Sequence, residues 1–262
     1  FADPSPEAFL RRVEDLRSGA ASGIAGFGIA PHSLRAVPRE WLSTLGAWAE
    51  SNGAPVHMHV SEQPADVEAA LAEHGRRPVE FLQDLGFLTQ RFTAVHAIHV
   101  TAAEIALLSS GGSTVCACPS TEANLGDGFV SAAALFAASV PVRLGTDSHA
   151  AIDPFAEMRE LDYRERLRSG SRAGAATPEQ LLEAATGGSR EAADFVTLDA
   201  DHPALAGADA ESLAGHLLAA GSPAVVRDVY VGGRKVVEAG RHQAQNEILR
   251  AFVELQERLW RS

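Results

Sequence analysis

The sequence is poor in cysteine, in basic residues and in long apolar runs. Only two cysteines occur, Cys116 and Cys118, which excludes a disulfide framework and is typical of a reducing cytoplasm. No run of about 20 apolar residues is present, so we expect no membrane span and no membrane partner. Lys and Arg number 22 against 34 Asp and Glu, a formal net charge of -12, which argues against nucleic acid as a partner.

What the chain does contain is an alternation of apolar runs and amphipathic helical patterns. We predict five strands, which start near residues 23, 55, 93, 114 and 141. Apolar strands separated by helices form parallel sheets, and each run here passes into a polar loop, such as the loop predicted over residues 119–128. At the carboxyl ends of a TIM-type (β/α)8 barrel such segments meet at one mouth. We therefore predict an α/β barrel fold. An open doubly wound sheet is the structural alternative, although no Gly-x-Gly-x-x-Gly motif supports a dinucleotide site.

The pattern changes in the last third of the chain. Helices are predicted over about 129–139, 154–169 and 178–186, and the many charges of the second are expected to form a solvated face. A short strand near 193–199 and a hairpin over 226–237, turned by Gly232 and Gly233, then precede a C-terminal helix. We predict three segments, which are the five βα units in residues 1–192, a small β appendage in 193–242 and a helix in 243–262.

The stretch from Pro55 to Gln63 carries the residue types of a metal site. In a strand, His57 and His59 lie on one face, and a neutral imidazole can bind a divalent metal ion. Glu62 follows three residues after His59, at a spacing that lets a carboxylate take a proton from a metal-bound water. One His-x-His pair is about as often an ordinary strand end, so the other strand ends decide between these interpretations.

The strand-end residues together describe metal-assisted hydrolysis of a C–N bond. His59 is a candidate metal ligand, and Asp147 is either a second ligand or the carboxylate that holds the attacking water. Glu62 would take a proton from that water and return it to the leaving group. His96 would hydrogen-bond the water or the tetrahedral centre. One divalent ion is expected, and zinc, iron and manganese all accept these ligands.

Several nearby residues have structural explanations. We expect His57 to be a buried partner inside the barrel rather than a ligand. His99 and His149 are expected as supporting or turn residues. Cys116 and Cys118 lie on one side of a strand without a second cysteine pair, so we interpret them as core residues.

Four motifs resemble the amidohydrolase superfamily, and two segments resemble more specifically its formimidoylglutamate deiminase family, which acts in bacterial histidine degradation. The specific segments are Ala30–Arg35 and Thr121–Gly128, and the similarity extends from about Gly23 to His242. The motifs read His57-Met58-His59-Val60-Ser61-Glu62-Gln63, Val95-His96-Ala97-Ile98-His99, Cys118-Pro119-Ser120-Thr121-Glu122-Ala123-Asn124 and Gly145-Thr146-Asp147-Ser148-His149.

The resemblance implies a metal-dependent (β/α)8 barrel, of which this chain would hold strands four to eight, with a small β-sandwich appendage. It implies a zinc ion with His59 and Asp147 among its ligands, Glu62 as the proton shuttle and His96 as the histidine of the sixth strand. The implied reaction is hydrolysis of N-formimino-L-glutamate to N-formyl-L-glutamate and ammonia by a metal-activated hydroxide.

The implied substrate is a small dicarboxylate amidine, which requires fixed cations. Arg35 is the best candidate, because its planar guanidinium matches a carboxylate, and His32 would assist. Glu122 and Asn124 are expected as further substrate contacts. The alternative is that the arginine and the histidine are ordinary loop and turn residues.

The sequence departs from the family in one respect, because the His-x-His pair of the family's first strand is absent. We therefore expect this polypeptide to be a C-terminal portion of a longer enzyme, inactive alone, with about three further barrel strands in the same or an associated chain. A homodimer is also implied. Two alternatives stay open. One is a sibling amidohydrolase that deaminates a nucleobase or cyclic amidine, and the other is a truncated, non-catalytic remnant.

Overall fold

The structure is a computed structural model that describes residues 3–20, 26–148, 151–172, 174, 176–187 and 193–260. The chain divides into two compact units, Phe1–Gly188 and Ser189–Ser262. Each unit has a four-stranded sheet of its own, so each is described by itself.

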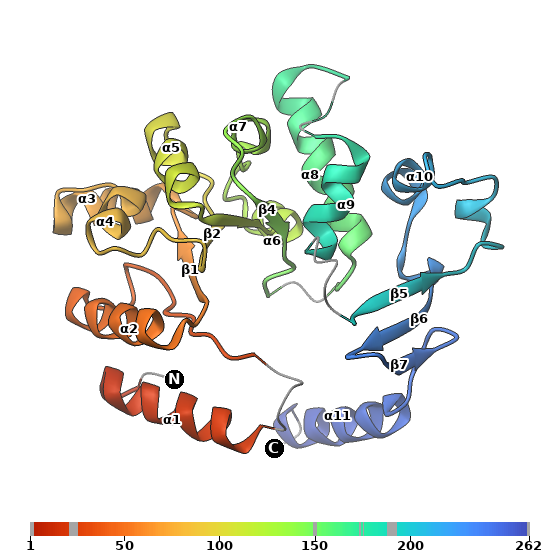
Figure 1. The fold of residues 1–262 in the computed structure, drawn as a ribbon, viewed down its shortest axis with the longest axis horizontal. Coiled ribbons are helices and arrows are strands. Elements are labelled where there is room, and N and C mark those ends of the chain that lie inside the picture. Colours follow the sequence, from red (N-terminus) through yellow and green to blue (C-terminus); the bar gives the residue numbers. More distant parts are fainter. Residues whose placement is uncertain are drawn as a thin grey trace. The chain divides into compact units, whose positions relative to one another are not determined.

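The first unit is built on a parallel sheet with the strand order β1-β2-β3-β4 (Figure 1). The strands are β1 (Val56–Val60), β2 (Phe92–His96), β3 (Thr114–Ala117) and β4 (Val142–Leu144). In β1, Val56, Met58 and Val60 are buried, whereas the two histidines between them are not. The predicted alternation is therefore confirmed, and it places both histidines on one face of the sheet.

Helices precede, connect and follow these strands, and they follow one another around the sheet in sequence order (Figure 1). Several begin at caps that the sequence offers, such as Thr101, whose hydroxyl accepts from the amide of Glu104. The helices are α1 (Pro6–Gly19), α2 (Arg39–Asn52), α3 (Pro64–His74), α4 (Pro78–Asp84), α5 (Ala102–Gly111), α6 (Pro119–Leu125), α7 (Ala132–Ala137), α8 (Pro154–Ser169) and α9 (Pro178–Thr186).

The strand predicted to start near residue 23 is not continuous where the structure describes it. Residues 21–25 lie outside the described residues, and beyond them Ile29 and Ser33 form isolated parallel bridges to β1. Pro31 lies between the two bridges and has no N–H group to donate, which interrupts a ladder. The segment still runs alongside β1, at the position of a further strand.

Two predictions on α6 and α8 are wrong. The first part of the predicted loop 119–128 is helical, because Pro119 suits the first helical position and Gly126, with φ 74°, ends the helix. The charged face of α8 is not all solvated, since Glu157, Arg164 and Glu165 are buried. Helices α6, α7 and α9 all pack against α8 and cover these side chains.

The second unit holds an antiparallel sheet in the order β5-β6-β7-β8, which confirms the predicted β appendage. Its elements are β5 (Phe195–Leu198), two short 3-10 turns (Pro203–Leu205 and Pro223–Val225), α10 (Leu213–Ala220), β6 (Val226–Val231), β7 (Arg234–Glu238), β8 (Arg241–His242) and α11 (Gln245–Trp260). Gly232 and Gly233 both have positive φ and form the predicted hairpin turn. Helix α10 is not predicted from the sequence.

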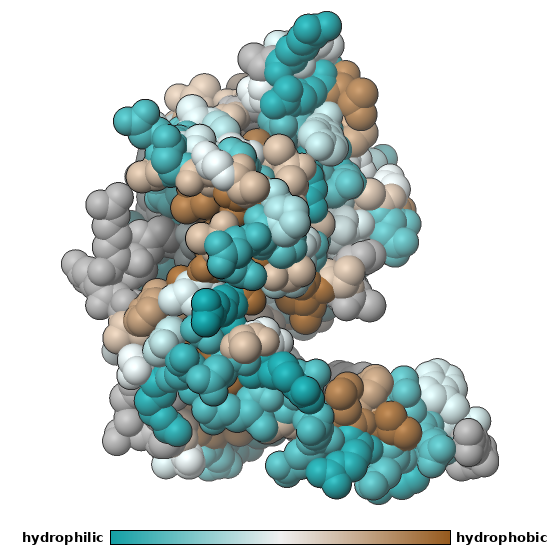
Figure 2. Space-filling view, turned by 90° about the vertical axis from the view of Figure 1, so that its right-hand side faces the viewer, coloured by the Kyte–Doolittle hydropathy of each residue, from teal (hydrophilic) through white to brown (hydrophobic). Residues whose placement is uncertain are grey.

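Apolar side chains reach the surface in places. Figure 2 shows hydrophobic patches between hydrophilic residues on one face of the molecule. On α11 no described residue is buried, and Phe252 and Trp260 are 53% and 82% exposed. No helix in the described ranges is both long and apolar enough to cross a membrane.

Candidate metal and catalytic site

Three potential metal ligands meet where the strands of the first unit end. His59 lies on β1, His96 is the last residue of β2 and Asp147 follows β4. One ligand atom from each lies within 4.8 Å of the other two. Glu62 belongs to the same cluster, with its Oε1 3.7 Å from His96 Nε2. The predicted convergence of strand-end residues is thus present in the structure.

The tautomer of His59 is set by a backbone group. Its Nδ1 lies 2.9 Å from the carbonyl oxygen of His32, which can only accept, so Nδ1 carries the proton. Nε2 of His59 therefore has a free lone pair, and it lies 3.8 Å from Asp147 Oδ1. The ring of His32 stacks on that of His59 with centroids 4.7 Å apart, which holds the ring plane in place.

His96 is fully buried and is held by Glu122. Its Nδ1 lies 3.4 Å from Glu122 Oε1, an oxygen that also accepts from the backbone amide of Cys118 at 2.8 Å. Burial lowers the pKa of His96, but the hydrogen bond to Glu122 and the charges of neighbouring carboxylates outweigh it, and the net pKa is raised. Nε2 of His96 has no hydrogen-bond partner among the described residues and lies 4.0 Å from Asp147 Oδ2.

This arrangement fits a divalent metal ion. Two imidazole Nε2 atoms and a carboxylate face one another, and such groups repel unless a proton or a cation lies between them. Four ligands at about 2.1 Å around a tetrahedral zinc ion lie roughly 3.4 Å apart, so a closure of about an ångström would complete the contacts. Zinc typically binds histidine through one ring nitrogen while the other donates to a carbonyl or carboxylate, as both rings do here. His96 thus joins the two ligands that the sequence predicts.

The backbone at this end of the sheet is unusual. Among described non-glycine residues, positive φ angles occur at Ser61 (50°), His96 (69°), Ala97 (50°) and Asp147 (47°), besides two positions elsewhere. Side chains with a Cβ disfavour this region, so these corners are held by their surroundings. The turn at His96 directs its ring toward the cluster.

Glu122 depends on a second buried carboxylate. Glu157 of α8 accepts from the backbone amide of Ser120 at 2.9 Å and also from its hydroxyl group. Both bonds anchor the first turn of α6, the helix that presents Glu122 to His96. Glu122 and Glu157 are 1% and 2% exposed, so this chain of contacts is shielded from water.

The loops that follow β1 and β2 are tied to the segment after α6. Gln63 Nε2 donates to Asp127 Oδ1 at 3.0 Å, and His99 Nε2 donates to the Asp127 carbonyl at 2.9 Å. Arg77 in turn donates to the carbonyl of His99 and pairs with the buried carboxylate of Glu104. His99 therefore connects loops and makes no described contact with the three-ligand cluster.

The predicted substrate residues lie in different environments. Arg35 is half exposed and forms an ion pair of 3.2 Å with Asp66. His32 lies against His59, as described above, and Asn124 is exposed on α6. Glu122 contacts His96 and the Cys118 amide, so its direct contact with a substrate stays a prediction.

Three other sequence-based expectations have clear outcomes. The expectation that His57 is buried is wrong, because its side chain is exposed on the same face as His59. His149 lies outside the described residues. Glu157 is missed from the sequence, since nothing in its local pattern shows that it will meet a helix that begins near Ser120.

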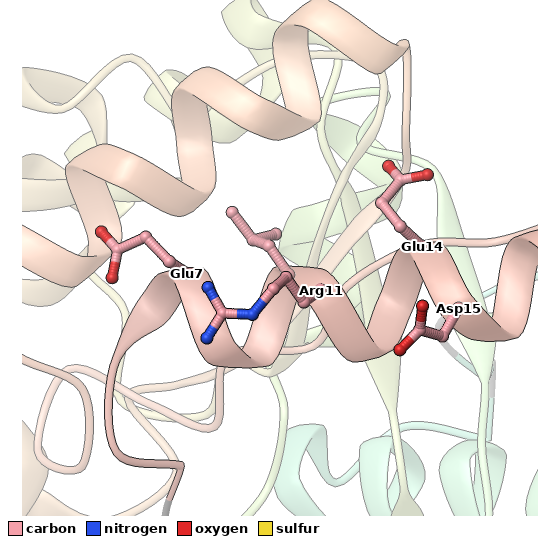
Figure 3. A pocket seen from close by; sticks show the side chains of 5 residues that line it. Glu7, Arg11, Glu14 and Asp15 are labelled. Atoms are coloured by element: carbon pink, nitrogen blue, oxygen red, sulfur yellow. The ribbon is translucent and has the colours of Figure 1, made fainter.

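A separate hollow of about 350 Å³ lies on α1 and is lined by Glu7, Leu10, Arg11, Glu14 and Asp15. Figure 3 shows the four labelled charged side chains projecting from one helix, with the guanidinium between carboxylates. None of these residues belongs to the three-ligand cluster, and such a charged helix surface is typical of solvated protein.

Parallel strands with a histidine and aspartate cluster at their carboxyl ends form a candidate metal site on an α/β scaffold. The model of the amidohydrolase family matches residues 2–236, and the chain belongs to that family. The fold prediction is confirmed: the chain is part of the amidohydrolase barrel with a small antiparallel appendage.

Among curated proteins, the formimidoylglutamate deiminase of Pseudomonas aeruginosa is 36% identical over 268 residues, which covers 95% of this chain and 59% of that protein. A 5-methylthioadenosine/S-adenosylhomocysteine deaminase of Halobacterium salinarum is 36% identical over 179 residues, or 67% of this chain and 41% of that protein. The chain therefore spans only part of the length of these relatives.

Among solved structures, an amidohydrolase from Brucella melitensis has a TM-score of 0.82 and 35% identity, and the match covers 95% of this chain and 59% of the other. A zinc-bound adenosine deaminase from Xanthomonas campestris has a TM-score of 0.85 and 24% identity, over 98% of this chain and 62% of the other. At that identity, the second likeness shows the fold alone.

Proposed function

We propose that the protein is a metal-dependent deiminase that hydrolyses N-formimino-L-glutamate to N-formyl-L-glutamate and ammonia in histidine degradation. The observation that carries the proposal is the convergence of two imidazole Nε2 atoms and a carboxylate, from His59, His96 and Asp147. The Pseudomonas aeruginosa relative supports the substrate, since it matches 95% of this chain. The chain covers only 59% of that relative, so the deiminase activity that we propose is that of the whole protein.

Each residue of the cluster has a part in this reaction. His59, His96 and Asp147 would hold one divalent ion, most fittingly zinc, which when bound activates water and polarises the C–N carbon. Glu62 faces the cluster from 3.7 Å and would accept the proton of the attacking water, then deliver it to the departing nitrogen. Glu122 holds the Nδ1 proton of His96 and so keeps its other nitrogen free.

We also propose that Arg35 and His32 bind a carboxylate of the substrate, and that Asn124 and Glu122 of α6 make further contacts with it. Arg35 is already paired with Asp66, so a substrate carboxylate would share or replace that partner. A planar guanidinium offers two parallel donors to such a group. A homodimer in solution is part of this proposal.

The test compares two matched arginines in the purified full-length protein. Arg35 and Arg76 are 53% and 56% exposed, and each pairs with an aspartate at 3.2 Å. A charged hydrogen bond contributes about 1.5–3 kcal/mol, so R35A should lower kcat/KM for N-formimino-L-glutamate roughly 10- to 100-fold, measured by ammonia release. R76A should leave it unchanged. Equal effects of the two changes, or no metal-dependent activity in the wild type, would refute the proposal.

A nucleoside deaminase is the second candidate, favoured by the Halobacterium salinarum relative. It predicts turnover of 5-methylthioadenosine or S-adenosylhomocysteine that R35A does not impair. The non-catalytic alternative predicts a purified protein without bound metal and without either activity.

A further inference from the structure

The sulfur atoms of Cys116 and Cys118 both face Gly145, although neither cysteine takes part in the proposed reaction. Cys116 lies on β3 and Cys118 precedes α6. A Cβ atom built on Gly145 would lie 2.9 Å from one sulfur and 3.2 Å from the other. The two sulfurs therefore border the same small space, which exists because residue 145 has no side chain.

This thiol pair lies beside the candidate metal site. The strand register sets His59 opposite Val95, Val95 opposite Cys116, and Cys116 opposite Arg143, so these residues form one row across the sheet. Cys116 is partly exposed, whereas Cys118 is 1% exposed. A group bound to Cys116 would thus project from the face that carries His59.

The chemistry of the two thiols differs. The hydrogen bond from Cys118 lowers the pKa of Cys116, while the same bond and burial raise the pKa of Cys118. The pair therefore has one accessible sulfur with increased thiolate character and a second sulfur next to it. Thiolate is the form that reacts with soft ligands.

We propose that Cys116 and Cys118 form a dithiol site for thiophilic ligands, namely trivalent arsenicals and soft divalent ions, and that its occupation blocks the neighbouring metal site. With an arsenical of the type R–As(OH)2, the two S–H bonds and the two As–OH bonds break. Two As–S bonds form, and both hydroxyl groups leave as water with the thiol protons. No oxidation or reduction is involved. The bound group adds bulk in the row that contains His59.

Phenylarsonous acid tests the site on the full-length protein by intact mass. The sequence of these 262 residues holds no other cysteine, so every arsenic–sulfur bond formed within it is assigned without ambiguity. We expect one adduct on this part of the protein, with loss of the thiols of both Cys116 and Cys118. C116A and C118A each leave one thiol, and a one-point adduct should dissociate roughly 100-fold more readily, because chelation is lost.

The outcomes separate this proposal from the proposed function. Two outcomes overturn the dithiol site: the wild type forms no adduct, or the adduct of C116A or C118A is as stable as that of the wild type. Neither measurement depends on enzymatic activity. If the adduct forms and excess dithiothreitol removes it, the site stands even where no deiminase activity is found. Blocking of the metal site is refuted if metal content and activity stay unchanged in the adduct. If C118A does not fold, the absorbance of the cadmium–thiolate complex is compared between the wild type and C116A, and this decides the same question.

Discussion

The parallel-sheet unit and the antiparallel unit of this chain differ in the side chains that they bury. The first unit buries His96, Glu104, Glu122 and Glu157, each at most 2% exposed. The second unit leaves apolar side chains in water, such as Phe195, which is 52% exposed. Its most buried charged group, Asp228, is 9% exposed and accepts from a backbone amide of the hairpin.

The difference shows that the first unit is the one that buries charged side chains, at a cost in folding free energy. A buried polar group is destabilising unless it is hydrogen-bonded, and in the first unit Glu104, Glu122 and Glu157 each accept from at least one donor. Those donors also orient the ligand cluster. Changes in the first unit should therefore affect metal binding and catalysis, and changes on the exposed face of the second should affect neither.

The largest effect is expected from His96→Asn. Asparagine can still donate to Glu122 but has no Nε2 atom to bind a metal ion. We expect loss of bound metal and a fall in kcat/KM of at least about 100-fold, measured by metal analysis and steady-state kinetics. H74N is the control, because His74 stacks on Phe81, a contact made away from the cluster. Full metal content in H96N would contradict the claim that changes in the first unit affect metal binding.

A smaller effect is expected from Glu122→Gln, which keeps the shape and removes the charge next to His96. A neutral amide makes the ring a weaker donor to the metal, and outer partners of metal ligands typically contribute about 10- to 100-fold. Competition with a chelator should show weaker metal binding by that factor. Unaltered affinity would mean that Glu122 only fills space.

A smaller effect again is expected from Glu157→Gln. The loss of one charge-assisted bond to Ser120 costs about 1 kcal/mol, or roughly a fivefold fall in kcat. E165Q is the matched control, since Glu165 is buried on the same helix and pairs with Arg168 instead of α6. If both variants have the same melting temperature and only E157Q lowers kcat, Glu157 acts on the site and not on overall stability. Equal kcat values would remove Glu157 from the support of the site.

The smallest effect is expected from Phe252→Ser on α11. A half-exposed side chain contributes little, so the free energy of unfolding should change by less than about 0.5 kcal/mol and kcat should stay the same. Thermal denaturation and kinetics check both values. A large loss of stability would show that another surface covers this face of α11 in solution.

The sequence alone predicted the parts of this molecule that depend on local pattern. The alternation in β1 and the Gly232-Gly233 turn each depend on residues a few positions apart. The cluster of His59, His96 and Asp147 was predictable too, because parallel strands end on one side of a sheet.

The parts that were not predictable depend on distant packing. Helix α6 was expected as a loop although Pro119 and Gly126 are local helix signals, and the residue that anchors its first turn, Glu157, lies 37 residues after Ser120. The exposure of His57 could not be foreseen from alternation, which assigns a face but not what covers it. The space that the two sulfurs share requires a glycine at residue 145, directly after β4, a relation that no local pattern contains.

The left-handed corners at Ser61, His96, Ala97 and Asp147 restrict how this sequence can vary. Each corner costs about 1–2 kcal/mol in backbone energy for a residue with a Cβ, and branched side chains suffer most. Ala97 has no functional group, yet Val at that position would crowd the turn that aims His96. A library of variants would thus show few tolerated substitutions at Ala97. A stability screen could favour glycine there, but glycine would relax the turn that holds the site together.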